Sequence, residues 1–102
     1  MGFNNGMRPV HPGEVLREDF LKPLKMSVNA IARQIGVPTS RLNDIVLERR
    51  GVTPDTAMRL ARYFGGDARS WLNLQTAHDL RIAEIGHAKE IERTVEPMRQ
   101  SA

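Results

Sequence analysis

The sequence predicts an all-α fold of five helices, with an extended carboxyl-terminal helix, in a chain of 102 residues. Two observations support this. Apolar residues recur at the i, i+3, i+4, i+7 spacing that places them on one face of a helix, and residues that start or stop helices bracket each of these segments. No segment has a convincing strand pattern, and the length suits one domain.

The first two helices have well-marked ends. The first is expected after Pro12 and Gly13 and ends near Pro23, because proline resists continuation of a helix. The second begins after Ser27, whose hydroxyl can accept a hydrogen bond from a first-turn amide, and ends at Gly36. The apolar positions of the two helices are Val15, Leu16, Phe20 and Leu21, then Val28, Ile31, Ala32 and Ile35.

Three more helices follow. The third opens at Pro38 or Thr39 and runs to about Leu47. The fourth has a capping threonine followed by proline, Thr53-Pro54, and stops at Gly65-Gly66. Asp67 caps the fifth, which is expected to continue to about Glu96, since Pro97 comes next.

This reading divides the chain into three parts. Residues 1–10 are expected to be flexible or extended, residues 11–84 to form the folded domain, and residues 85–102 to form a helical extension with a loose tail.

Composition excludes several classes of protein. The chain has no cysteine, which rules out disulfides and thiolate metal sites and permits a reducing compartment. No apolar run approaches the roughly 18 residues of a membrane span. The net charge is +3, and six arginines but no lysines lie between Arg33 and Arg62. The arginine fork suits phosphates and guanine edges, although a solvated surface explains such charges equally well.

No enzyme, cofactor or metal site is expected. The sequence contains no metal-binding helix motif, phosphate loop or nucleophile elbow. Among the histidines, His11 is expected to lie at a helix entry and cap it, His78 to pack within a helix, and His87 to be solvated.

The link between the second and third helices resembles a helix-turn-helix, in which a short turn containing glycine joins two steeply crossed helices. Gly36 permits the turn, Ala32 allows close approach, and the apolar side of the third helix packs into the core. Its outer face is polar. The candidate base-reading residues on that face are Thr39, Ser40, Arg41, Asn43 and Asp44.

Other residues near this face are candidates for phosphate contacts. They are Ser27, through the amides beside it, Arg49 and Arg50 after the third helix, and Thr53 at the start of the fourth. The alternative is an ordinary helical hairpin with a solvated face.

The fifth helix carries two apolar stripes. Trp71, Leu74, His78, Ile82 and Ile85 form the first, which is expected to pack on the domain. Ala77, Leu80, Ala88, Ile91 and Val95 form the second. A small core needs one such face, so the second stripe predicts a homodimer that reads a palindromic DNA site, with recognition helices about 34 Å apart.

Longer segments carry a family resemblance over roughly residues 7–84. The run from Ser27 to Gly65 resembles the helix-turn-helix of phage-repressor-like (XRE-type) proteins. With "HPGE", "DTAMRLARYFG" and "WLNLQ" in this order, the chain resembles the HigA antitoxins, also called VapI-like proteins. Val28 departs from the pattern, since many phage-type repressors have a phosphate-holding glutamine there.

The resemblance implies a lambda-repressor-like fold and a cytoplasmic bacterial antitoxin of a type II toxin–antitoxin system. Such a protein binds and neutralises a HigB-like toxin, an mRNA-cleaving enzyme of the RelE type, and represses the shared operon. Two alternatives stay open: a stand-alone phage-type repressor without a toxin, and a helical adaptor that no longer binds DNA.

Overall fold

The computed structural model of the chain describes residues 8–99, and these residues contain helices and no strand. The first helical stretch is continuous and comprises three segments, α1, η2 and α2, of which η2 has π-helical winding. The bounds are α1 Pro12–Val15, η2 Leu16–Leu21, α2 Lys22–Leu24, α3 Val28–Ile35, α4 Thr39–Val46, α5 Pro54–Phe64 and α6 Ala68–Thr94. The all-α, five-helix prediction is confirmed.

The helix ends lie close to where the sequence places them. The side-chain oxygens of Ser27, Thr53 and Asp67 accept hydrogen bonds from backbone amides of the first turn, at 3.1, 3.4 and 2.8 Å respectively. Gly36 ends α3 with a φ of 75°, a left-handed conformation that glycine adopts without steric cost. These local signals therefore set the lengths of α3, α5 and the start of α6.

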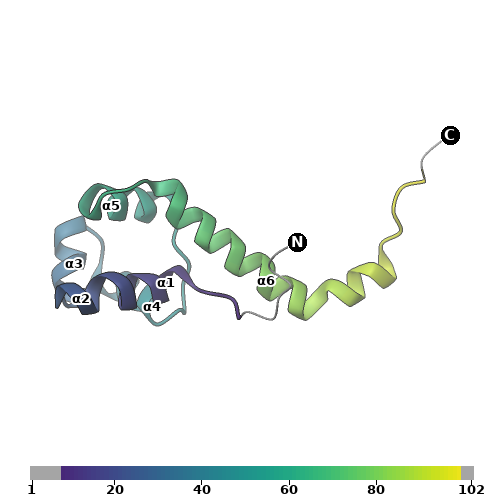
Figure 1. Cartoon of the computed structure of the whole chain (residues 1–102), viewed down its shortest axis with the longest axis horizontal. Helices are drawn as coiled ribbons and strands as arrows, with labels where there is room; N and C mark the ends of the chain where they lie inside the picture. Colours follow the sequence, from purple (N-terminus) through teal and green to yellow (C-terminus); the bar gives the residue numbers. More distant parts are fainter. Residues whose placement is uncertain (1–7, 100–102) are drawn as a thin grey trace.

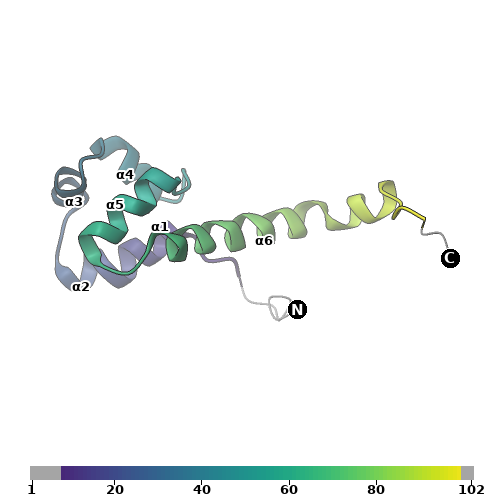
Figure 2. The ribbon, with the colours of Figure 1, turned by 90° about the horizontal axis from the view of Figure 1, so that it is seen from above.

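The core lies where the first helical stretch, α3, α4, α5 and the start of α6 meet. Figure 2 shows α3 and α4 along one edge of the domain and the first helical stretch along the other, with α5 between them. The buried apolar side chains are Leu16, Leu21, Ile31, Ala32, Ile35, Val37, Leu42, Ile45, Val46, Val52, Ala57, Leu60 and Trp71. The apolar stripes predicted for the first four helices contribute most of this list.

An aromatic cluster fixes the start of α6 on the domain. The Phe20 ring lies 4.7 Å from the Phe64 ring and 5.5 Å from the Trp71 ring, measured between centroids. Trp71 is buried, and Leu74 and His78 are partly buried. The first turns of α6 thus belong to the globular domain.

Beyond these turns α6 leaves the domain and projects away from it (Figures 1 and 2). The Cα radius of gyration is 17.2 Å, against about 13 Å for a compact domain of 100 residues. The expectation that Ile82 and Ile85 pack on the domain is wrong, because their side chains are 50% and 62% exposed. The helix also ends at Thr94, two residues before the predicted Glu96.

Most of the amino-terminal segment expected to be flexible, residues 1–7, lies outside the described residues. Residues 8–10 carry no regular secondary structure, and Arg8 donates two hydrogen bonds of 2.7 Å to the Glu14 carboxylate. Within residues 8–99, none of the helices has the length and apolar character needed to cross a membrane.

Candidate nucleic-acid interface

Helices α3 and α4 are joined by a turn of three residues, Gly36 to Pro38. The amides of Gly36 and Val37 both donate to the Ala32 carbonyl, at 2.9 and 3.1 Å. Ala32 is 1% exposed and Val37 is 7% exposed, so the turn is anchored on the core. The predicted helix–turn–helix geometry is present.

One side of α4 is apolar and buried and the other is polar and at least partly exposed, as the sequence predicts. Leu42, Ile45 and Val46 are buried. The five candidate base-reading residues lie outside the core: Thr39, Ser40 and Asn43 are exposed, and Arg41 and Asp44 are partly exposed. The structure thus brings these five polar side chains onto one short helix, and their contact with bases stays a prediction.

Arg49, a candidate for a phosphate contact, forms an ion pair with Asp44, a candidate base-reading residue. An Arg49 Nη lies 3.5 Å from an Asp44 carboxylate oxygen, and both side chains are more than a third exposed. An exposed pair of this kind contributes at most about 1 kcal/mol. Arg49 could therefore exchange Asp44 for a phosphate at small cost, while Arg50 lies exposed beside it.

Ser27 and Thr53, the other candidate phosphate residues, each cap a helix through the side-chain hydroxyl. Ser27 Oγ accepts from the Ala30 amide, which leaves its hydrogen to donate elsewhere. Thr53 Oγ1 accepts from the Thr56 amide and lies 3.3 Å from Thr56 Oγ1. Because Thr56 Oγ1 can also be the donor in the contact with Thr53 Oγ1, both the Ser27 and the Thr53 hydroxyl can donate to a phosphate.

Gly13 sets how closely the first helical stretch approaches α4, which the sequence reasoning missed. A Cβ at Gly13 would lie 1.8 Å from the Ile45 carbonyl oxygen and 3.0 Å from His11 Nδ1. Only a residue without a side chain fits there. The sequence predicts Gly13 before the first helix, whereas the structure places it inside α1, which begins at Pro12.

His11 caps α1, as expected, and also contacts α6. Its Nδ1 accepts a 2.8 Å hydrogen bond from the Gly13 amide, and its ring meets the His78 ring edge-on with centroids 4.8 Å apart. Burial, with a smaller contribution from His78, lowers the pKa of His11. The neutral ring required for an accepting Nδ1 is thereby favoured.

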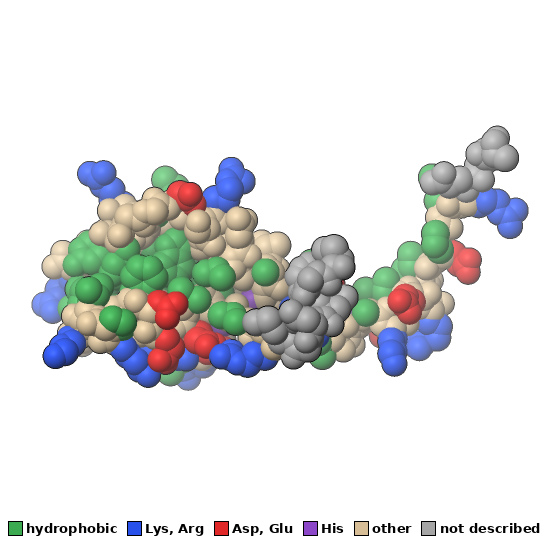
Figure 3. Space-filling model, in the orientation of Figure 1, with side chains coloured by type: hydrophobic (Ala, Val, Ile, Leu, Met, Phe, Trp, Pro, Cys, Tyr) green, Lys and Arg blue, Asp and Glu red, His purple; other side chains and the backbone are tan. Residues whose placement is uncertain are grey.

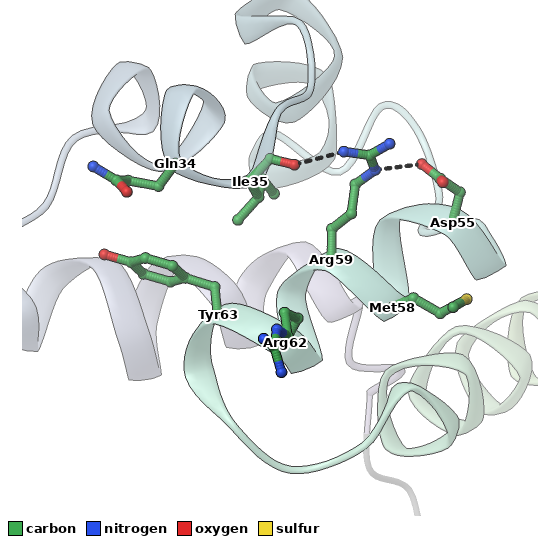
Figure 4. Close-up of a pocket in the computed structure, with 7 residues that line it drawn as sticks. All are labelled: Gln34, Ile35, Asp55, Met58, Arg59, Arg62 and Tyr63. Carbon is green, nitrogen blue, oxygen red and sulfur yellow. Dashed lines mark hydrogen bonds and ion pairs between the residues drawn. The ribbon is translucent and has the colours of Figure 1, made fainter.

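Two arginines bind the carbonyl ends of the helix-turn-helix, and the sequence reasoning missed both. Arg59 of α5 donates to the Ile35 carbonyl and to Asp55, each at 2.8 Å (Figure 4). Arg17 of η2 donates to the Val46 carbonyl. Because helix carboxyl ends carry partial negative charge, these guanidinium groups stabilise α3 and α4 where each ends.

The loop after α4 is tied to α6. Glu48 takes a left-handed φ of 63°, and the Val52 amide donates to Gln75 Oε1 at 2.7 Å. A Cβ at Gly51 would lie 2.9 Å from the Gln75 side chain. Arg49 and Arg50 are therefore carried on a loop with a defined path.

The described residues show no catalytic arrangement. A hollow of about 640 Å³ between the end of α3 and α5 is lined by Gln34, Ile35, Asp55, Met58, Arg59, Arg62 and Tyr63 (Figure 4). Its one carboxylate is paired with Arg59. Within residues 8–99 no group of three or more histidine, cysteine or acidic residues could hold a metal ion.

The anchored turn, the polar outer face of α4 and the arginines behind it define a helix-turn-helix DNA-binding protein. Residues 18–71 match the helix-turn-helix family model, which covers just over half of the chain. Virulence-associated protein I of Dichelobacter nodosus is 60% identical over 80 residues, 78% of this chain and 74% of that protein. Antitoxin HigA-1 of Vibrio cholerae is 36% identical over 74 residues, 72% of this chain and 69% of that protein.

Solved structures of antitoxins are also similar to this chain. Pseudomonas aeruginosa antitoxin HigA with the higBA promoter superimposes with a TM-score of 0.86 at 44% identity, covering 90% of this chain and all of that one. Antitoxin GraA in complex with its operator gives 0.87 at 49% identity, covering 94% and 97%. The chain belongs to the helix-turn-helix family, in its HigA-like and VapI-like branch. This is a family of DNA-binding regulators and not a known class of enzyme.

Proposed function

We propose that the protein is the antitoxin of a type II toxin–antitoxin system and represses its own operon. The observation that carries the DNA-binding part is the exposed polar face of α4 beside Arg49 and Arg50. Similar chains form complexes with a promoter or an operator. A repressor of a bacterial operon works in the cytoplasm, which is the proposed location.

The proposed docking places α4 in the major groove. Asn43 and Ser40 are the exposed side chains best suited to hydrogen-bond base edges, and Arg41 can reach guanine. Pro38 gives α4 no side-chain cap, so amides of its first turn are left for another partner. Arg49, Arg50 and the hydroxyl of Ser27 then contact phosphates on either side.

The base-reading and phosphate roles predict different mutational effects. Asn43→Ala should relax the preference among sequences and cost roughly 1–3 kcal/mol if its contact is bidentate. Ser40→Ala should also relax that preference. Arg49→Ala should weaken binding to all sequences alike and lower the salt slope by about one unit. Electrophoretic shifts across a salt series, on DNA from upstream of the protein's own gene, measure both effects.

Arg93→Ala removes the same charge at the far end of α6 and serves as the control. It should leave sequence preference unchanged and alter the salt slope less than Arg49→Ala. If Arg49→Ala changes sequence preference while Asn43→Ala does not, the proposed docking is wrong.

A homodimer is part of the proposal. Four residues of the second stripe, Ala77, Leu80, Ala88 and Ile91, are exposed on α6. The fifth, Val95, lies just past the end of the helix with an extended backbone, so its predicted place on the stripe is wrong. Leu80 and Ile91 are 51% and 54% exposed, which is unusual for large apolar residues on one helix face. Burying such a side chain contributes about 1.5–3 kcal/mol. A second copy of the chain would cover this face and place two α4 helices on a palindromic operator.

Toxin neutralisation rests on the similarity to HigA antitoxins. The proposed partner is a HigB-like mRNA-cleaving toxin of the RelE type, and we propose that it docks on the folded helical surface rather than on the residues after Glu96. Deleting residues 97–102 should therefore leave neutralisation intact. Co-expression with the product of the adjacent reading frame, scored by growth, tests this.

Two outcomes of that assay count against the proposal. Loss of rescue on deleting residues 97–102 would place toxin binding in the tail. If the unmodified chain does not rescue growth but still binds the operator, the protein is a stand-alone repressor without a toxin partner.

A further inference from the structure

The loop that follows α4 carries both candidate phosphate arginines. It runs from residue 47 to residue 53, between the end of α4 and the start of α5, and Arg49 and Arg50 are exposed on it. Lysine and arginine side chains line the lower edge of the domain in Figure 3, where α4 and the first helical stretch lie in Figure 1. The two arginines thus follow directly on a helix that lies along this basic edge.

Contacts with α4 and η2 hold the first half of the loop. The Glu48 amide donates to the Ile45 carbonyl at 2.9 Å. The Arg49 amide donates to the Asp44 carbonyl at 2.8 Å. The Glu48 carboxylate lies 3.5 Å from a guanidinium nitrogen of Arg17. These contacts fix the backbone of the loop as far as Arg49.

Gln75 of α6 holds the second half of the loop. Its Oε1 accepts a 2.7 Å hydrogen bond from the Val52 amide, and its Nε2 donates to Asp79 Oδ1 at 2.9 Å. Val52 is buried and Gln75 is partly buried. Because a carboxylate only accepts, Asp79 takes the NH₂ end of the Gln75 amide and leaves its oxygen facing the loop.

Gly51 allows the loop to approach Gln75 closely. A Cβ at Gly51 would lie 2.9 Å from Oε1 and 3.0 Å from Nε2 of Gln75. These atoms belong to the amide group that binds Val52, so a single methyl group at position 51 would displace that bond. Arg49 and Arg50 therefore lie between two anchors, one on α4 and the other on α6.

We propose that Gln75 is a positioning residue for DNA binding, which holds the loop in the path that presents Arg49 and Arg50 to phosphates. The proposal rests on the operator binding proposed above and adds a residue of α6 to it. An arginine on an ordered loop loses less conformational entropy on binding a phosphate than one on a mobile loop. Gln75 acts through the loop, so its effect on affinity requires the two arginines.

Limited trypsin digestion of the free protein tests whether Gln75 holds the loop. Gln75→Leu removes the acceptor for the Val52 amide and should speed cleavage after Arg49 and Arg50, relative to cleavage after Arg93 near the end of α6. Gly51→Ala should have the same effect without any change in α6, because its methyl group displaces the Gln75 amide.

An exchange of hydrogen-bonding groups should restore the loop. In the double variant Gln75→Glu with Asp79→Asn, the carboxylate introduced at position 75 accepts from Val52 and from the amide introduced at position 79, and the net charge is unchanged. This variant should be cleaved as slowly as the unmodified chain. Asp79→Asn alone keeps an acceptor for Gln75 and is the control for the lost charge.

A double-mutant cycle on DNA from upstream of the protein's own gene tests the effect on binding. Gln75→Leu should weaken binding by the otherwise unmodified chain on the order of tenfold, because the arginines must then be ordered on binding. In the Arg49→Ala, Arg50→Ala background it should have no further effect, since residues that act together are not additive. Sequence preference should stay unchanged throughout.

The outcomes separate this role from a general contribution to the fold and from DNA binding itself. Cleavage of Gln75→Leu at the unmodified rate, or fast cleavage of the double variant, shows that this hydrogen bond does not hold the loop and overturns the proposal. An equal loss of affinity in both backgrounds also overturns it, because Gln75 would then support the whole fold. If the unmodified chain does not bind the DNA, operator binding fails and the positioning role with it, while the digestion still decides whether Gln75 holds the loop.

Discussion

Gly13→Ala should unfold the protein at much lower temperature than the unmodified chain. The new methyl would lie 1.8 Å from the Ile45 carbonyl oxygen, so either α1 or α4 must move. Overpacking typically costs about 1–3 kcal/mol, and this overlap involves backbone rather than a flexible side chain. We expect a loss of at least about 3 kcal/mol, which for a domain of this size lowers Tm by more than roughly 10 °C.

Gly86→Ala is the matched control for this prediction. Gly86 lies within α6, and a Cβ there would meet no described atom within 4 Å. Alanine should stabilise that helix by up to about 1 kcal/mol relative to glycine. Thermal unfolding followed by circular dichroism compares the two variants. Equal Tm values would show that the close approach of Gly13 to Ile45 does not hold α4 in place.

Leu80→Glu combined with Ile91→Glu should convert a dimer into helical monomers. Both side chains are about half exposed in the single chain, so the substitutions leave its core intact but would place four carboxylates in the proposed interface. Loss of the linked second contact should weaken binding to a full palindrome by about 10²–10⁴-fold, close to half-site affinity. Light scattering at several concentrations and gel shifts on whole and half sites measure the two effects.

Ile82→Glu combined with Gly86→Glu adds the same charge on another side of α6. Ile82 is 50% exposed, and Gly86 is exposed with open space around it. This control should stay dimeric and keep full affinity for the palindrome. If the Leu80→Glu, Ile91→Glu variant stays dimeric, the interface lies elsewhere on the chain. If the variant unfolds, the second stripe of α6 belongs to the core.

The sequence by itself determined the helices and which sides of them are apolar or polar. Ser27, Gly36, Thr53 and Asp67 mark helix ends because capping involves backbone groups only a few residues away. The apolar periodicity is equally local, so the buried sides of α3, α4 and α5 and the polar outer face of α4 follow from it. The family resemblance, confirmed by the comparisons, rests on the order of longer motifs.

Only the tertiary structure decided how these elements are held together. Gly13 meets Ile45 across 32 positions of sequence, and Arg59 reaches the Ile35 carbonyl across 24, contacts that no local pattern encodes. Periodicity likewise placed Ile82 and Ile85 on the same stripe as Trp71 but could not show that the domain ends before them. A stripe shows which residues share a face of a helix, and the size and shape of the neighbouring core determine how far along the helix that face is covered.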